Sequence, residues 1–169
     1  MLLRKEVINS MDFYPASICL NGHIVSNNEA NSQKFCSLCG KQVISICPHC
    51  KSPLHGTRKS SKGLAIPYKF EMSYYCHNCG NPFPWTENII NSAVEILSMD
   101  EELPEEQKEL LKSAIPDLIV ESPNTTVAVA RYSKYIATAK IFIRSGLYQL
   151  FSSVLTESII LKLFPQNPQ

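Results

Sequence analysis

Four short clusters, which together hold seven cysteines and one histidine, constrain the fold of this chain more than any other feature of its sequence. Within each cluster, two or three residues separate two metal-binding side chains, so both can reach one ion from a tight turn. Four such clusters supply eight ligands, the number that two tetrahedral zinc ions require. We therefore predict two zinc ions, with the following ligands: Cys19, His23, Cys36, Cys39, Cys47, Cys50, Cys76 and Cys79.

The four clusters can share two metals in three ways. Adjacent pairing joins the first cluster to the second and the third to the fourth, a cross-brace joins the first to the third, and a nested arrangement joins the first to the fourth. The second and fourth clusters have the same pattern, an aromatic residue followed by Cys-x-x-Cys and glycine, which is typical of the closing half of a ribbon. The third cluster, Cys47-Pro-His-Cys50, is interpreted as an opening half. This order favours adjacent pairing, with the cross-brace as the alternative.

The cysteines could instead form disulfides or bind iron, and the sequence bears on both alternatives. Disulfides would leave one of seven thiols unpaired, and the opening segment Met1-Leu-Leu-Arg-Lys-Glu6 has no apolar core of a secretory signal. We therefore expect a cytoplasmic protein with reduced thiols. Iron is an alternative for the all-cysteine site, whereas the histidine of the first site favours zinc. His49, His55 and His77 are expected to be loop residues rather than ligands.

Several of these segments resemble a bacterial double-zinc-ribbon family known as a domain of unknown function. The segments that carry the resemblance are Ile18-Cys-Leu-Asn-Gly-His-Ile-Val25, Phe35-Cys-Ser-Leu-Cys-Gly40, Cys47-Pro-His-Cys50, Tyr75-Cys-His-Asn-Cys-Gly80 and Pro82-Phe-Pro-Trp-Thr-Glu87. The resemblance extends from about Met11 through the C-terminal helices. It implies zinc binding and a bacterial or phage origin, and it implies no particular activity.

Charge is unevenly distributed along the chain. Residues 36–85 carry six basic residues and one acidic residue, whereas residues 86–121 carry two basic and ten acidic residues. Seven ligating thiolates bring more negative charge than two zinc ions neutralise, so metal binding makes the formal net charge of +1 negative. The basic residues near the second metal site offset its thiolates, and a general attraction to nucleic acid is not indicated.

The order of the patterns predicts an α+β fold, with tandem zinc ribbons of short antiparallel strands followed by a small α-helical C-terminal domain. We expect a flexible lead over residues 1–16, the tandem ribbon over residues 17–85 and the helical domain over residues 86–169. Within the ribbons, residues 51–63 are expected to form a mobile loop, because they are rich in proline, glycine, serine and basic residues.

Apolar residues at helical spacing predict three helices after the ribbons. Thr86 is expected to cap the first, and Pro104 to open the second, which Pro116 ends or kinks. The third is expected to run from about Thr125 to Phe164, because one apolar stripe persists over this range.

The end of this last helix lacks the regular separation of polar and apolar faces. Residues 145–156 are uncharged but too few to span a membrane, which needs about 20 residues, so no transmembrane segment is predicted. After Glu157 apolar side chains point to all sides of the helix, which predicts an exposed patch. The side chains concerned are Ile159, Ile160, Leu163 and Phe164. We expect residues 147–164 to contact a second copy of the chain or another protein.

The sequence contains no phosphate-binding glycine loop and no recognisable catalytic constellation. Zinc sites with four protein ligands also lack the open position that catalysis requires. We therefore expect no enzyme, but a zinc-stabilised protein-interaction or adaptor module. The first alternative is a nucleic-acid-binding zinc ribbon protein that uses residues 58–62 and the aromatic residues Tyr68, Tyr74 or Phe83. The second is an effector whose C-terminal amphipathic helix acts on membranes.

Overall fold

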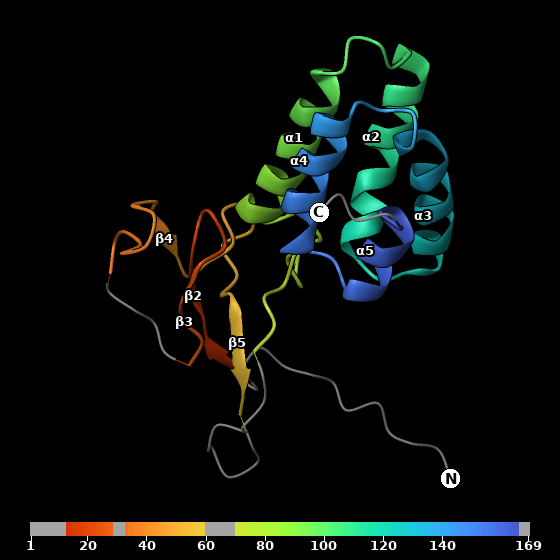
Figure 1. The fold of residues 1–169 in the computed structure, drawn as a ribbon. Coiled ribbons are helices and arrows are strands. Elements are labelled where there is room, and N and C mark those ends of the chain that lie inside the picture. Colours follow the sequence, from red (N-terminus) through yellow and green to blue (C-terminus); the bar gives the residue numbers. More distant parts are fainter. Residues whose placement is uncertain (1–12, 29–32, 60–69, 166–169) are drawn as a thin grey trace, which may run out of the picture. The chain divides into compact units, whose positions relative to one another are not determined.

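The computed structural model describes residues 13–28, 33–59 and 70–165 of the chain (Figure 1). The chain divides into two compact units, which we call the ribbon unit, Met1–Thr86, and the helical unit, Glu87–Gln169. Among the described residues, short antiparallel strands occur in the first half and helices in the second. The predicted α+β fold is therefore confirmed.

Two small antiparallel sheets form the framework of the ribbon unit. In one, strand β2 (Ser17–Cys19) lies between β3 (Ile24–Ser26) and β4 (Val43–Ile44). In the other, β1 (Phe13–Pro15) pairs with β5 (His55–Arg58). Of the predicted flexible lead, residues 1–12 lie outside the described residues, whereas Phe13–Pro15 is part of this second sheet.

Strand β5 lies within the segment that was predicted to be a mobile loop, and that prediction is wrong for residues 54–58. Leu54, Gly56 and Thr57 are buried. The N–H of Thr57 donates to the carbonyl oxygen of Asn27 at 2.6 Å, and Leu54 accepts a hydrogen bond from Ala16. These partners are distant in the sequence, so composition alone could not reveal the strand. Residues 60–63 of the predicted loop lie outside the described residues.

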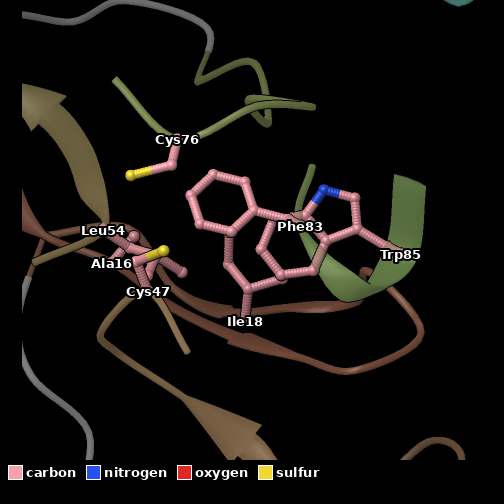
Figure 2. Packing of buried hydrophobic residues seen from close by; sticks show 7 residues of the cluster. All are labelled: Ala16, Ile18, Cys47, Leu54, Cys76, Phe83 and Trp85. Carbon is pink, nitrogen blue, oxygen red and sulfur yellow. The ribbon is translucent and has the colours of Figure 1, made fainter. Parts of the chain in front are cut away.

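The ribbon unit has a small apolar core, whose members come from β2, from residues next to β1 and β5, from the third and fourth cysteine clusters and from the segment after the fourth cluster (Figure 2). The rings of Phe83 and Trp85 stack within it with a centroid distance of 4.7 Å. The indole N–H of Trp85 donates to the carbonyl of Ser73 at 2.9 Å, which satisfies the polar edge of this buried ring. The core residues are Ala16, Ile18, Cys47, Leu54, Cys76, Phe83 and Trp85.

The first helix, α1 (Pro84–Ser98), begins at the end of the ribbon unit. Thr86 lies inside its first turn, and the hydroxyl of Thr86 donates to the carbonyl oxygen of Tyr74 at 2.6 Å. The prediction that Thr86 caps the helix is therefore wrong. Proline suits the first turn of a helix, so α1 begins at Pro84, two residues before Thr86. The hydrogen bond from Thr86 to Tyr74 instead links the first turn of α1 to the segment after residue 70.

The helical unit continues with α2 (Glu105–Ile119), α3 (Pro123–Ile136), α4 (Ile141–Ser152) and α5 (Glu157–Leu163). Helices α2 and α3 pack side by side, and α5 contacts both α3 and α4 (Figure 1). Pro116 lies inside α2, which continues for three further residues, so it does not end the helix. Ser122 caps α3, and its side chain accepts a hydrogen bond from the N–H of Asn124.

The single long helix predicted between Thr125 and Phe164 is wrong, because α3, α4 and α5 are separate. The turn before α4 is held by Asp100, whose buried carboxylate accepts a hydrogen bond from the N–H of Lys140 at 2.9 Å. The same carboxylate accepts hydrogen bonds from the N–H groups of Glu102 and Leu103. Burial alone would raise the pKa of Asp100, but these three N–H groups lower it.

This division into separate helices also changes the environment of the C-terminal segment. Each of the four side chains predicted to form an exposed patch is at most 9% exposed: Ile159, Ile160, Leu163 and Phe164. Helix α5 turns back at Thr156 and packs against α3, where the hydroxyl of Ser133 donates to the carbonyl of Lys162. The predicted apolar patch is therefore wrong, because a short separate helix can bury sides that a straight continuation of α4 would expose.

Candidate metal centres

The first centre is formed by four residues from the first two clusters, Cys19, His23, Cys36 and Cys39. The Nδ1 atom of His23 lies 3.5 Å from the sulfur of Cys19, 3.7 Å from that of Cys36 and 3.3 Å from that of Cys39. The sulfurs of Cys19 and Cys39 are 3.7 Å apart. Strand β2 ends at Cys19, so the sheet itself delivers the first ligand.

The second centre is formed by Cys47, Cys50, Cys76 and Cys79. The sulfurs of Cys47 and Cys79 are 3.8 Å apart, and those of Cys50 and Cys76 are 3.6 Å apart. None of the seven cysteines is in a disulfide. The structure therefore has the adjacent pairing of clusters, not the cross-brace.

The distances within both centres fit a tetrahedral metal ion. Four sulfurs at about 2.3 Å from a central zinc lie about 3.8 Å from one another, and a nitrogen at about 2.0–2.1 Å lies about 3.6 Å from each sulfur. All ligand atoms of each centre lie within 4.8 Å of one another. Each residue set thus fits one ion with a full shell of four protein ligands. Iron has similar bond lengths to thiolates, so the geometry does not distinguish the two metals; the histidine of the first centre favours zinc there, whereas the four thiolates of the second centre suit either metal.

Each Cys-x-x-Cys cluster is a tight turn closed by a small β-bridge. The bridges join Phe35 to Gln42, Ile46 to Pro53 and Tyr75 to Pro82. The residue after the second cysteine has a positive φ, which is 71° at Gly40 and 72° at Gly80. Glycine adopts this conformation without strain, and it turns the chain back towards the sulfurs. At the third cluster the same position is occupied by Lys51, with a φ of 64°.

Thiols of the two centres differ in their pKa values. Burial tends to raise the pKa of Cys36, but the backbone N–H groups of Leu38 and Cys39 lower it to about 7. In the second centre burial raises the pKa of Cys47 to about 11. Because metal ions bind thiolates, loading of the second centre must release the proton of Cys47.

Ser52 is a residue of the second centre that the sequence analysis missed. Its hydroxyl oxygen lies 3.0 Å from the sulfur of Cys50 and 3.4 Å from that of Cys76. Its hydrogen bond is the main reason that the pKa of Cys50 is lowered to about 5. In the sequence, Ser52 appears only as a serine two residues after the second cysteine of the third cluster. Serine is too common for this position alone to predict a contact with the sulfurs.

The remaining histidines, and the aromatic residues that the sequence analysis considered for nucleic-acid binding, are not ligands of either centre. His49, His55 and His77 belong to neither group, although the rings of His55 and His77 stack at 3.7 Å. Of the aromatic residues considered for nucleic-acid binding, Phe83 is in the core, so the prediction of its exposure is wrong. Tyr74 is half-buried, and Tyr68 lies outside the described residues.

Within the described part of the chain, no helix has both the length and the apolar character needed to cross a membrane.

Two adjacent four-ligand centres, each closed by cysteine turns and small β-bridges, define the ribbon unit as a double zinc ribbon. Residues 12–163 match a protein family described as "Uncharacterized protein conserved in bacteria (DUF2321)", and the chain belongs to this family. The resemblance to an uncharacterised bacterial family is therefore confirmed. No curated protein and no solved structure matches the chain.

Proposed function

We propose that this protein is a zinc-stabilised interaction or adaptor module, in which two zinc ions have a structural role and no catalysis takes place. The observation that carries the proposal is the complete set of four protein ligands in each centre. A catalytic zinc keeps a coordination position open for water or substrate, whereas a structural zinc is closed by its protein ligands. The cytoplasm suits this role, because its reducing conditions keep the thiols free for metal.

The surface around the first centre supports an interaction role. Leu38, at the tip of the second cluster, is 77% exposed, and Phe35, directly before that cluster, is 60% exposed. The turn geometry at the metal forces these apolar side chains outward while burying Cys36. Exposed apolar groups on a rigid metal-bound turn are suited to contact with another protein.

The alternatives have less support. Of the aromatic residues considered for stacking on nucleic acid, Phe83 is buried and Tyr74 is half-buried, and the exposed Phe35 lies outside the basic segment of residues 58–62. Lys59 lies over the ring of Tyr14 at 5.1 Å, so part of the basic segment contacts the protein itself. An effector helix that acts on membranes needs an apolar face to insert, whereas Ile159, Ile160 and Leu163 of α5 are buried and Leu161 is its one exposed apolar side chain.

The structural role of the metals can be tested by replacing zinc with cobalt(II), whose visible spectrum reports its coordination. We expect two cobalt ions per chain with tetrahedral spectra that do not change when azide or excess thiol is added. A spectral change on addition of either ligand would reveal an open coordination position and would contradict the structural role.

The interaction role can be tested by chemical cross-linking followed by affinity purification of the full-length protein. We expect a defined partner protein in stoichiometric amounts, and a strong reduction of its recovery for Leu38→Ser. Val127→Ser, which changes a 59% exposed apolar residue in the helical unit, is the matched control. Equal recovery by both variants would exclude this surface, and the absence of any partner would contradict the adaptor role.

A further inference from the structure

A cleft of about 540 Å³ lies in the ribbon unit, beside the second sheet. Sites for small ligands and peptide side chains commonly have volumes of about 300–1,000 Å³. The described residues that line the cleft come from β1, from β5 and from the segment after residue 69. They are Phe13, His55, Gly56, Arg58, Phe70, Glu71 and Ser73. None of them is a ligand of either metal centre.

One side of the cleft is built on a column of flat rings. The ring of Phe13 stacks on that of His55 with a centroid distance of 4.3 Å and an interplanar angle of 8°. His55 in turn stacks on His77, which belongs to the fourth cysteine cluster. This column connects the cleft to the second metal centre, and its rings hold one another in a fixed orientation. It therefore offers a preformed apolar surface, to which Phe70 adds a further ring.

The backbone beneath this column is also fixed. Gly56 packs so closely against the chain that a side chain there would overlap the carbonyl oxygen of Asn27 and lie 2.9 Å from that of Tyr14. Together with the hydrogen bond from Thr57 to Asn27, this packing holds β5 in place. A preformed site loses little entropy when a ligand binds.

Two polar side chains of the cleft, those of Arg58 and Ser73, are exposed to a ligand, whereas the third polar group is buried. Arg58 is exposed and forms no ion pair with any described acidic residue. The Nε2 atom of His55 is buried and has no hydrogen-bond partner among the described residues. Burial and the nearby His77 lower the pKa of His55, so its ring is neutral at physiological pH. Ser73 adds a hydroxyl group.

From these groups we infer that the cleft binds a short segment of a partner protein in which an acidic residue lies near an aromatic or large apolar one. The apolar side chain packs against Phe13 and Phe70, and the carboxylate pairs with Arg58. The inference rests on the proposed interaction role and supplies the chemistry of the partner.

The same groups disfavour other occupants. A nucleic-acid strand brings a phosphate at each nucleotide, but the described lining offers one arginine and also contains Glu71, which repels phosphate. A basic segment would be repelled by Arg58 but attracted by Glu71, so the lysine peptides of the experiment below test which of the two charges decides. A single carboxylate next to an apolar group matches Arg58, which is exposed, has no ion pair with a described acidic residue and lies beside the aromatic rings.

The experiment titrates the zinc-loaded, ¹⁵N-labelled full-length protein with two sets of amidated hexapeptides. Each peptide of the first set contains one phenylalanine and one glutamate at varied spacing, and the second set has lysine in place of glutamate. Arg58→Gln removes the cation, and Lys41→Gln is the matched control, because it removes an exposed basic residue beside the first centre. Metal content of two ions per chain verifies that each variant is folded.

We expect acidic peptides to bind and to shift the amide signals of residues 13, 55–58 and 70–73. Arg58→Gln should weaken this binding about tenfold, which corresponds to about 1.4 kcal/mol, because it removes a charge-assisted hydrogen bond to the carboxylate. Lys41→Gln should leave it unchanged, and Glu71→Gln should strengthen it a few-fold by removing a nearby negative charge.

Three results would overturn the inference: no binding of any acidic peptide at millimolar concentration, equal binding of lysine peptides, or equal binding to Arg58→Gln. Affinity purification separates this failure from failure of the proposed function. If Arg58→Gln recovers the partner as well as the natural chain does, the cleft inference fails and the adaptor role stands. If peptides bind the cleft but no partner is recovered, the cleft stands and the adaptor role fails.

Discussion

Replacement of Gly56 by alanine should destabilise the ribbon unit strongly. The added Cβ would overlap the carbonyl oxygen of Asn27 and lie 2.8 Å from its carbonyl carbon and 2.9 Å from the oxygen of Tyr14. All three are backbone atoms, so no side-chain rotation can relieve the overlap. The strand β5 must move away from Asn27, and this movement breaks the hydrogen bond that Thr57 donates at 2.6 Å.

The cost follows from these two effects. Overpacking of a closely packed site costs about 1–3 kcal/mol, and loss of a backbone hydrogen bond costs about 0.5–1.5 kcal/mol. We therefore expect Gly56→Ala to lower the free energy of unfolding of the ribbon unit by about 2–4 kcal/mol. Such a change would shift the urea midpoint by about 1 M or more.

Fluorescence of Trp85 is the appropriate signal, because it is the only tryptophan in the sequence and lies in the core of the ribbon unit. The titration should be done at a fixed excess of free zinc, so that metal binding stabilises every variant equally. Gly146→Ala is the matched control. Its Cβ would meet Ile96 at 3.5 Å, an ordinary contact, and alanine favours a helix interior by about 0.5–1 kcal/mol.

The control should therefore stabilise the helical unit, as measured by circular dichroism, and leave the tryptophan transition unchanged. Surface substitutions usually change the free energy of unfolding by no more than about 0.5 kcal/mol. If Gly56→Ala changes the free energy of unfolding of the ribbon unit by no more than this, Asn27 does not approach Gly56 closely and the reasoning is refuted.

Three further changes test other parts of the structure. Tyr132→Phe should stabilise the helical unit to thermal unfolding by about 1 kcal/mol, because the buried hydroxyl of Tyr132 has no partner among the described residues; a loss of stability would indicate a hydrogen bond to this hydroxyl. Because the folded-state pKa of Asp100 is lowered, its stabilisation should be present above the ordinary carboxyl pKa of about 4 and disappear as the pH falls through the lower folded value. Asp100→Asn should reduce that acid dependence in circular dichroism, and an unchanged profile would exclude Asp100 as its source. Cys47→Ala and Cys76→Ala should each remove the same metal ion by native mass spectrometry and leave the site of Cys19 filled, whereas metal loss at Cys19 would support the cross-brace.

The ribbons were accessible to sequence reasoning because their determinants are local. Two ligands in one tight turn are encoded within four or five residues, as in Cys36-Ser-Leu-Cys39, and the spacing alone indicates the chemistry. The resemblance of the second and fourth clusters also indicated which pairs share a centre. The same reasoning could not find Ser52, because a hydroxyl near a sulfur has no distinctive sequence pattern.

Features that depend on distant partners were missed. Residues 55–58 form a strand only because β1, about forty residues earlier, pairs with them, and Gly56 is required by the close approach of Asn27. The break before α4 is stabilised by Asp100, which lies 40 residues away in the sequence. An apolar stripe that continues through such a break appears as one long helix when only periodicity is considered. The burial of α5 follows from that break, so it could not be predicted either.

The central claim is that each chain holds two structural zinc ions, one in each four-ligand centre. Native mass spectrometry of protein purified without chelators or added metal measures this directly, because the mass difference between native and acid-denatured protein gives the identity and number of bound ions. The structure has two four-ligand groups, so our proposal predicts two zinc ions per chain, and treatment with a strong chelator should remove both and unfold the ribbon unit. One ion or none per chain, or a metal other than zinc in both centres, would contradict the claim.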